Sequence, residues 1–167
     1  HNGSKQRALD SIYCAKECGA SAIKLQTYTA ESMTIDCDKK EFLIQGGLWK
    51  GYKLFDLYRE AATPYEWFAE LYDYAHEINI PIFSTPFDES AVDLLEELNT
   101  PAYKIASFEL NDTPLVKYVA KKGKPIIIST GLSKISEIKD TLNVIRREGC
   151  NDIVLLHCIS SYPAPIE

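Results

Sequence analysis

The feature that most limits the possible folds is a regular alternation of short apolar runs with segments of helical periodicity. Strand-like runs occupy residues 22–28, 81–85, 102–107, 125–130 and 153–158. Apolar residues at helical spacing fill most of the segments between them. Residues 126–128 are apolar without a break, so this strand is expected to be buried on both faces. That pattern is typical of a parallel sheet covered by helices.

The expected helices carry start and stop signals. Thr63-Pro64-Tyr65-Glu66 combines a capping box with a proline in the first turn, and predicts a helix that runs to about residue 78. Asp88 is expected to cap a helix that ends near residue 98. Thr113-Pro114 opens a helix that ends before Gly123. Two further helices are expected over 5–17 and 133–147.

The segment from residue 29 to residue 63 is too long for a simple connection. It contains Gly46-Gly47-Leu48-Trp49, and Leu54, Leu57 and Tyr58 predict a short helix near its end. Loops of this length are usually either functional or disordered.

Composition excludes several classes of protein. The chain has 167 residues, a size that favours one domain. Hydrophobic residues make up 46% and charged residues 25%, which argues against wholesale disorder. The net charge of −6 argues against non-specific nucleic-acid binding. No apolar run approaches the ~18 residues of a membrane span and no secretory signal is visible, so a cytoplasmic protein is expected.

The five cysteines contain no CxxC pair. Cys14 and Cys18 are four residues apart, a spacing that suits a metal, but no nearby histidine completes a site. The favoured interpretation is small buried thiols in a reducing compartment.

Polar residues recur where each expected strand ends. The hydroxyl-bearing ends are Gln26-Thr27, Ser84-Thr85, Ser107, Ser129-Thr130 and Ser160-Ser161. The carboxyl ends of parallel strands share one rim, where such folds bind ligands. These hydroxyls also have a structural interpretation, because Ser and Thr end strands and cap helices.

Two lysines lie inside expected strands, Lys24 and Lys104. A mid-strand ammonium is costly to bury unless it pairs with an anion, so these lysines favour a phosphate or carboxylate ligand. Glu109 follows just beyond the strand of Lys104 and is a candidate general acid or base, or else a solvated loop residue.

Other polar residues are weaker candidates. His157 lies in an apolar strand and is expected to be a core histidine, whereas His76 is expected at the surface. Tyr162 lies in a proline-rich loop and either contacts ligand or packs. Gly46-Gly47 is not followed by the Lys-Ser/Thr pair of a phosphate loop, and no dinucleotide or nucleophile-elbow motif occurs.

Short motifs occur in order across the whole chain, at 1–4, 22–27, 83–88, 103–107, 124–126 with 129–131, and 155–158 with 162–165. Together they resemble the sialic acid synthase family, enzymes that condense phosphoenolpyruvate with an amino sugar. Residues 44–49, 54–58, 63–67 and 105–109 look like the pseudaminic acid synthase branch of that family. The long loop is then expected to determine which sugar is used.

The resemblance implies a TIM (β/α)8 barrel, of which this chain has about five βα units. It implies condensation of phosphoenolpyruvate with 2,4-diacetamido-2,4,6-trideoxy-altrose to give pseudaminic acid and phosphate by C–O cleavage. It also implies Mn²⁺ or Mg²⁺, which polarises the sugar aldehyde. The positions that match phosphoenolpyruvate contacts are Lys24, Thr85, Lys104, Ser107, Ser129 and Tyr162.

Three positions complete the site that the resemblance implies. Gln26 matches a sugar-side position, and Glu109 matches the carboxylate that transfers protons. Ser160 stands where sialic acid synthases typically carry Asn. Lys104 and Glu109 are thus the expected catalytic residues.

Parts of the family pattern do not occur in residues 1–167. They are the first strand, the later strands with two metal-binding histidines, and the small C-terminal antifreeze-like domain. We therefore expect a partial barrel, metal ligands outside this chain and a homodimer in the full-length protein.

Alternative functions remain open at this stage. One is an N-acetylneuraminate or legionaminic acid synthase. Another is a non-catalytic α/β module that binds a sugar phosphate or a protein partner. A third is a different barrel enzyme that condenses phosphoenolpyruvate. This alternative does not account for the long segment 29–63 that contains Trp49, which we call the Trp49 loop.

Overall fold

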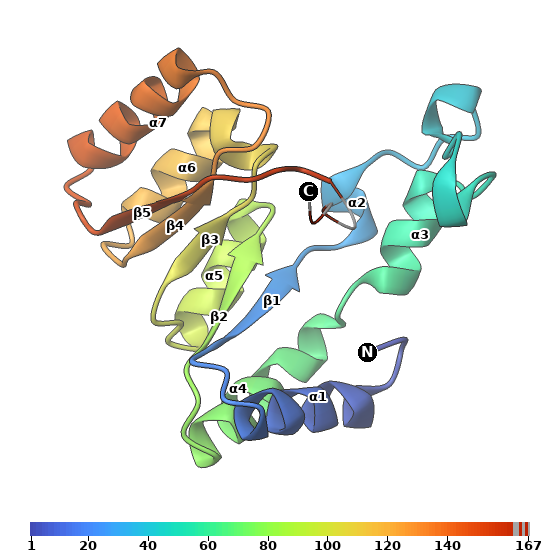
Figure 1. Ribbon diagram of the computed structural model, residues 1–167, viewed down its shortest axis with the longest axis horizontal. Helices are drawn as coiled ribbons and strands as arrows, with labels where there is room; N and C mark the ends of the chain where they lie inside the picture. Colours follow the sequence, from blue (N-terminus) through green and yellow to red (C-terminus); the bar gives the residue numbers. More distant parts are fainter. Residues whose placement is uncertain (162–163, 165, 167) are drawn as a thin grey trace. The chain divides into compact units, whose positions relative to one another are not determined.

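The strands of this computed structural model are hydrogen-bonded in chain order, β1-β2-β3-β4-β5, as one sheet (Figure 1). The structure describes residues 1–161, 164 and 166. The chain forms two compact units, His1–Ile82 and Phe83–Glu167. The alternation of strands and helices predicted from the sequence is therefore confirmed.

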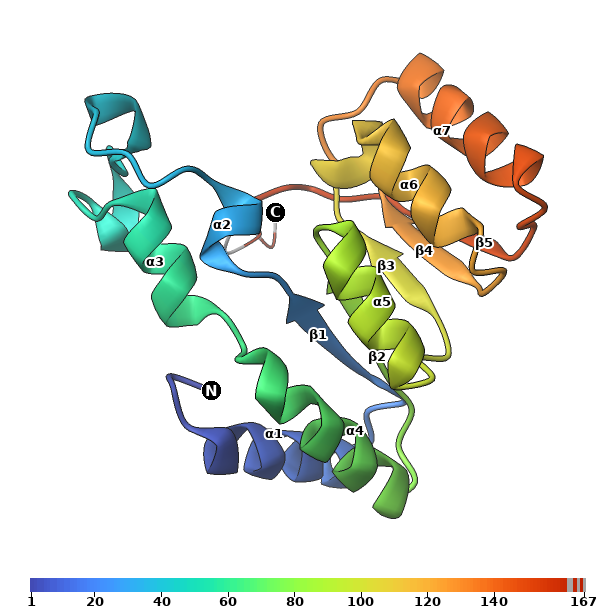
Figure 2. The ribbon, with the colours of Figure 1, turned by 180° about the vertical axis from the view of Figure 1, so that it is seen from behind.

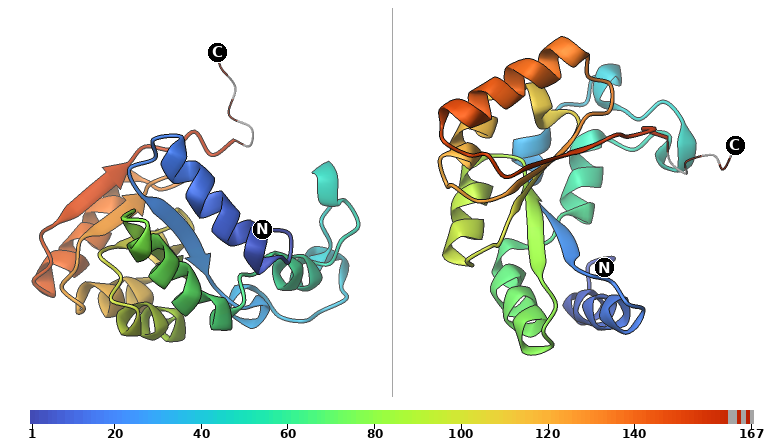
Figure 3. Two further views of the ribbon diagram at one scale, coloured as in Figure 1. Left: turned by 90° about the horizontal axis from the view of Figure 1, so that it is seen from below. Right: turned by 60° about the vertical axis from the view of Figure 1, so that its left-hand side comes forward.

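In the first unit, two helices that are distant in sequence pack against each other. α1 (Lys5–Glu17) leads to β1 (Ile23–Thr27), and α4 (Phe68–Glu77) packs against α1 (Figure 3). The Ser4 hydroxyl begins α1 by accepting a hydrogen bond from the Arg7 N–H at 3.3 Å. The two helices are also joined by the Lys5–Glu70 ion pair.

The capping box expected at Thr63 does not form. Residues Tyr65–Trp67 make a 3-10 turn, η3, and α4 begins only at Phe68. The Thr63 hydroxyl is instead hydrogen-bonded to Nε2 of His1 at 3.1 Å. Because the Thr63 hydroxyl is bonded to His1, it does not cap the helix.

The long segment after β1 is built from short helical pieces. They are α2 (Ala30–Met33), η1 (Lys40–Phe42), η2 (Gly47–Trp49) and α3 (Leu54–Ala61). Lys53 closes the loop, because its ammonium pairs with Asp36 and Asp38. These hydrogen bonds raise the pKa of Lys53. The loop exposes Leu48 and half of Trp49.

The second unit repeats a strand-helix pattern. Its elements are β2 (Ile82–Pro86), α5 (Glu89–Glu97), β3 (Tyr103–Ile105), η4 (Glu109–Asn111), α6 (Thr113–Ala120), β4 (Ile126–Ser129), α7 (Ile135–Arg147) and β5 (Ile153–Leu156). The first residue of β2, Ile82, is counted with the first unit. The neighbouring strands run parallel, with Lys104 beside Ile127 and Ile127 beside Val154. Asp88 caps α5 through the Ala91 N–H at 2.7 Å, as predicted.

The core of this unit lies between the strands and their helices. Figure 2 shows α5 and α6 in front of β3 and β4. Alternate strand residues Tyr103, Ile105, Ile126 and Ile128 are buried on the helix side. Thr141 of α7 joins that helix to η4, because its buried hydroxyl donates to the Leu110 carbonyl at 2.9 Å.

The opposite side of the sheet is only partly covered. Ile127 and Ser129 of β4 are half-buried, and Val154, Leu155 and Leu156 of β5 are exposed. Burial on both faces, predicted for residues 126–128, is therefore only partly confirmed, because Ile126 and Ile128 are buried and Ile127 between them is half-buried. Within the described residues, no element covers β5 on its outer edge.

Burial of the thiols differs from the expectation. Cys14 and Cys18 are exposed, because both lie on the solvent side of α1. Cys150 is buried and donates to the Lys124 carbonyl at 3.4 Å. Among the described helices, none combines the length and apolar character needed to cross a bilayer.

Candidate functional site

The candidate site in the second unit is built around Lys104. This side chain is only 7% exposed, on the side of β3 that faces away from the helices. Its ammonium donates to the Ser129 Oγ at 2.6 Å and to the Ile105 carbonyl at 2.8 Å. The oxygens in these two hydrogen bonds are neutral, and an anionic oxygen of a ligand would bond the ammonium more strongly.

Hydroxyls gather beside this ammonium from neighbouring strand ends. Ser107 follows β3, and its Oγ accepts the Gly131 N–H at 3.2 Å. The oxygens of Ser107 and Ser129 therefore accept bonds from the protein, and their own O–H groups can donate elsewhere. Thr85 is buried one residue beyond the Ser84–Tyr103 pair, which places it alongside Lys104.

Residues after β5 complete this group. A Cβ placed on Gly131 would lie 2.2 Å from the Ser160 Oγ, 3.0 Å from the Ser107 Oγ and 3.2 Å from the Cys158 Cβ. Ser160 and Cys158 therefore lie against the loop that follows β4. We call Lys104, Ser107, Ser129, Cys158 and Ser160 the Lys104 cluster.

Cys158 was not among the residues predicted for the site. Hydrogen bonding by the Ser129 hydroxyl lowers the pKa of the Cys158 thiol, and this outweighs the opposing effect of burial. Ser107 and the backbone N–H groups of Thr130 and Gly131 act in the same direction. The sequence held one signal for Cys158, its place directly after the last strand.

Glu109 supplies a carboxyl group near the cluster. It begins η4, and its Oε2 is buried without a hydrogen-bond partner among the described residues. Burial raises the pKa of Glu109, the Asp112 charge adds to this, and a backbone hydrogen bond and the Lys104 charge oppose it. A half-buried carboxyl with one unpartnered oxygen and a raised pKa suits proton transfer.

The remaining predicted site residues lie elsewhere. Lys24 and Gln26 alternate along β1 of the first unit, so both project from one face of that strand, and both are exposed. Partial desolvation lowers the pKa of Lys24. Tyr162 lies outside the described residues.

The histidine predictions have mixed outcomes. His76 is exposed, as expected. His157 is exposed, so its assignment to the core is wrong. The reason is that β5 ends at Leu156 and its side chains are not covered within the described chain.

The Lys104 cluster does not fit a divalent metal. The described residues contain no group of three or more His, Cys, Asp or Glu that could hold one. The ammonium at the centre of the cluster also repels a cation. Its donors fit an anion instead.

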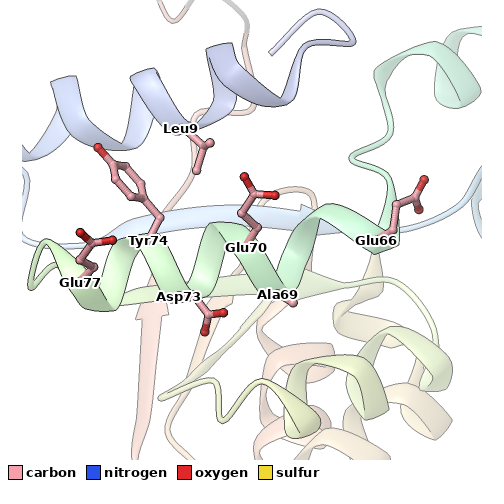
Figure 4. Close-up of a pocket in the computed structure, with 7 residues that line it drawn as sticks. All are labelled: Leu9, Glu66, Ala69, Glu70, Asp73, Tyr74 and Glu77. Atoms are coloured by element: carbon pink, nitrogen blue, oxygen red, sulfur yellow. The ribbon is translucent and has the colours of Figure 1, made fainter.

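An acidic hollow in the first unit offers no comparable chemistry. It lies between α1 and α4 and is lined by Leu9, Glu66, Ala69, Glu70, Asp73, Tyr74 and Glu77 (Figure 4). Glu70 and Tyr74 extend toward α1, whereas Asp73 points to the other side of α4. Glu70 is already paired with Lys5, so the hollow is a solvated helix-helix groove.

Comparisons with known proteins match this chain over almost its whole length. The model of the NeuB family matches residues 11–167. The pseudaminic acid synthases of Helicobacter pylori and Campylobacter jejuni are each 46% identical over the whole chain. The N,N'-diacetyllegionaminic acid synthase of Campylobacter jejuni is 35% identical over 99% of the chain. The chain spans about half the length of these curated relatives, 49% of each pseudaminic acid synthase and 50% of the legionaminic acid synthase.

Solved structures show the same fold. The N-acetylneuraminic acid synthetase of Leptospira borgpetersenii superposes with a TM-score of 0.84 at 30% identity, over 99% of this chain and 53% of that one. A truncated 3-deoxy-D-arabino-heptulosonate 7-phosphate synthase from Thermotoga maritima superposes at 0.65 with 12% identity, over 92% of this chain and 47% of that one. The second likeness concerns the fold alone. Together they confirm the predicted α/β fold class, part of a TIM barrel.

Proposed function

Since the chain belongs to the NeuB family, we propose that it forms the phosphoenolpyruvate-binding part of a sugar-acid synthase. The proposed reaction joins phosphoenolpyruvate to 2,4-diacetamido-2,4,6-trideoxy-altrose and yields pseudaminic acid and phosphate. The observation that carries the proposal is the buried Lys104 ammonium among hydroxyl groups, with the Glu109 carboxyl, whose Oε2 has no hydrogen-bond partner among the described residues, near it.

Binding of phosphoenolpyruvate follows from the charges. The ligand carries a phosphate and a carboxylate, and the cluster offers one buried ammonium and the O–H groups of Ser107, Ser129 and Ser160. Ammonium-to-anion hydrogen bonds are about twice as strong as neutral ones. They also gain strength where water is excluded. The anion would therefore accept a charge-assisted hydrogen bond from Lys104.

The reaction forms one C–C bond and breaks one C–O bond. C3 of phosphoenolpyruvate attacks the open-chain aldehyde, whose oxygen becomes a hydroxyl. Water adds at C2, and the C2–O bond to phosphate then breaks, which leaves the keto group. Glu109 accepts a proton from the attacking water and passes it to the new sugar hydroxyl, and the second proton leaves with phosphate.

The choice of sugar rests on similarity. Identity to the pseudaminic acid synthases is 46%, against 35% for the Campylobacter jejuni legionaminic acid synthase. The Trp49 loop, closed by Lys53, is proposed to select the sugar. The competing assignment is an N-acetylneuraminate or legionaminic acid synthase.

A substrate panel on the full-length protein tests the proposal. Phosphoenolpyruvate is offered with the altrose derivative, N-acetylmannosamine or the legionaminic acid precursor, with and without Mn²⁺ after chelation. Pseudaminic acid and phosphate in equal amounts are expected. Preference for another sugar would overturn the sugar assignment, and no product from any sugar would overturn the synthase assignment. Proposed metal dependence, with ligands outside the described residues, predicts loss of turnover after chelation.

Lys104 is tested by Lys104→Ala and by Lys104→Met, which retains more of the side-chain volume. Loss of a buried charge partner should lower kcat/KM by about a hundredfold or more. Lys117→Ala is the matched control, because Lys117 is an exposed lysine of α6. Near-normal turnover of both Lys104 variants would contradict the assigned role.

A further inference from the structure

Gly131 lies where three strand ends converge, and its backbone does not require a glycine. It is buried two residues after β4, and its φ lies outside the left-handed region. Six other glycines have positive φ, which explains their residue type by backbone conformation. The reason for glycine at position 131 is therefore steric.

Side chains occupy the position where a Cβ of residue 131 would lie. An added Cβ would lie 2.2 Å from the Ser160 Oγ and 3.0 Å from the Ser107 Oγ. Every other glycine of the described chain has open space at this position. A Cβ at 131 would thus meet the very hydroxyls that form the Lys104 cluster.

The backbone around Gly131 is pinned, so it cannot move aside freely. Both the N–H and the hydroxyl of Thr130 donate to the Leu156 carbonyl, at 3.0 and 2.9 Å. The Gly131 N–H donates to the Ser107 Oγ at 3.2 Å. This last bond makes Ser107 an acceptor toward the protein and directs its O–H away from Gly131.

We propose that Gly131 is a positioning residue for phosphoenolpyruvate: it orients the Ser107 hydroxyl through its N–H and leaves the space that Ser160 occupies. The inference rests on the proposed function. It predicts that a side chain at 131 weakens phosphoenolpyruvate binding and leaves sugar binding intact.

The first test is Gly131→Ala in the full-length protein, by steady-state kinetics. Displacing two hydroxyl donors should raise KM for phosphoenolpyruvate by about tenfold or more, while KM for the sugar stays within about twofold. An unchanged KM for phosphoenolpyruvate would overturn the proposal. Equal changes in both KM values would also overturn it.

The second test is rescue by Ser160→Gly. Ser160 has a φ of 56°, a conformation that glycine adopts without strain, so this change removes only the hydroxymethyl group. Gly131→Ala should raise KM for phosphoenolpyruvate much less in the Ser160→Gly background than in the wild-type background. The same fold-change in both backgrounds would show that the crowding is irrelevant.

Gly123→Ala is the control for a purely structural effect. Gly123 has a φ of 71° and open space around it, so alanine there strains the backbone without touching the cluster. It should lower Tm and leave both KM values unchanged. A Gly131→Ala variant that only lowers Tm, as Gly123→Ala does, would contradict a positioning role.

Calorimetric titration of the wild-type protein with phosphoenolpyruvate separates two kinds of failure. If the wild-type protein neither binds phosphoenolpyruvate nor turns over, the proposed function fails. If it binds and Gly131→Ala binds equally well, only the inference about Gly131 fails.

Discussion

At the residue scale, the site depends on what surrounds each polar atom. Lys104 is buried yet hydrogen-bonded to neutral oxygens, whereas Oε2 of Glu109 is buried with no hydrogen-bond partner among the described residues. The first arrangement places an ammonium at the proposed anion site. The second disfavours the carboxylate and favours the protonated acid. Two charged residues thus acquire different roles from their environments.

Glu109 has a predictable pH dependence. Its pKa is raised on folding, so the folded protein binds this proton more tightly than the unfolded chain. The favourable contribution of the protonated group is present at low pH and is lost as pH rises through the folded pKa. Glu109→Gln should therefore keep or increase Tm at pH 8.

The same variant should lose catalysis. Removing the proton acceptor is expected to lower kcat by at least about a hundredfold. In the wild-type protein, the acid limb of kcat should lie above the pH expected for an ordinary glutamate. Measuring kcat and Tm on one preparation tests both statements. A fall in Tm together with retained kcat would refute them.

Most residues of the Lys104 cluster could be predicted from the sequence. Lys104 was predictable because an ammonium in mid-strand demands a partner, and Ser107 and Ser129 because strand ends meet on one rim. Cys158 was missed, because its hydrogen bonds come from Ser129 and Ser107, which are far from it in sequence. Tertiary contacts of this kind leave no local pattern.

At the element scale, helix caps fix the position of the turn that contains Glu109. Asp112 caps α6 through the Leu115 N–H at 3.1 Å and ends η4, the turn that carries Glu109. Asp88 was predictable as a cap because its interaction is local. Thr63 was not, because its partner His1 lies 62 residues away.

Asp112 allows the cap and the charge to be tested apart. Asp112→Asn retains an oxygen that caps α6 and removes the negative charge near Glu109. The acid limb of kcat should then move to lower pH with Tm nearly unchanged. Asp112→Ala should shift the limb similarly and also lose about 1 kcal/mol of stability.

The outcome of this pair is read from pH profiles and chemical denaturation. Identical pH profiles for the wild type and Asp112→Asn would show that the Asp112 charge does not reach Glu109. Equal stability of Asp112→Asn and Asp112→Ala would show that the cap contributes nothing.

At the scale of the whole chain, two compact units carry different parts of the proposed chemistry. The first contains Lys24, Gln26 and the Trp49 loop, and the second contains the Lys104 cluster and Glu109. The strand order was predictable because alternating βα segments favour neighbouring parallel strands. The exposure of β5 was not predictable, because an apolar sequence predicts a buried strand whether or not another element covers it.

This exposure predicts self-association of the 167-residue chain when it is expressed alone. Val154, Leu155 and Leu156 form an uncovered apolar strand, which is a template for pairing with another chain. Val154→Lys should reduce association in size-exclusion chromatography. Ile135→Lys is the control, because Ile135 is exposed on a helix and not on a strand. A monomeric wild-type chain would contradict this prediction.

The Thr141 hydroxyl connects α7 to η4, the turn that contains Glu109. It anchors η4 from α7, on the side of the sheet away from Lys104, and η4 carries Glu109. A substitution in α7 can therefore displace η4 and, with it, Glu109, the residue proposed to transfer protons. In any comparison of related enzymes, changes along α7 should be considered together with pH optima, and not dismissed as neutral surface variation.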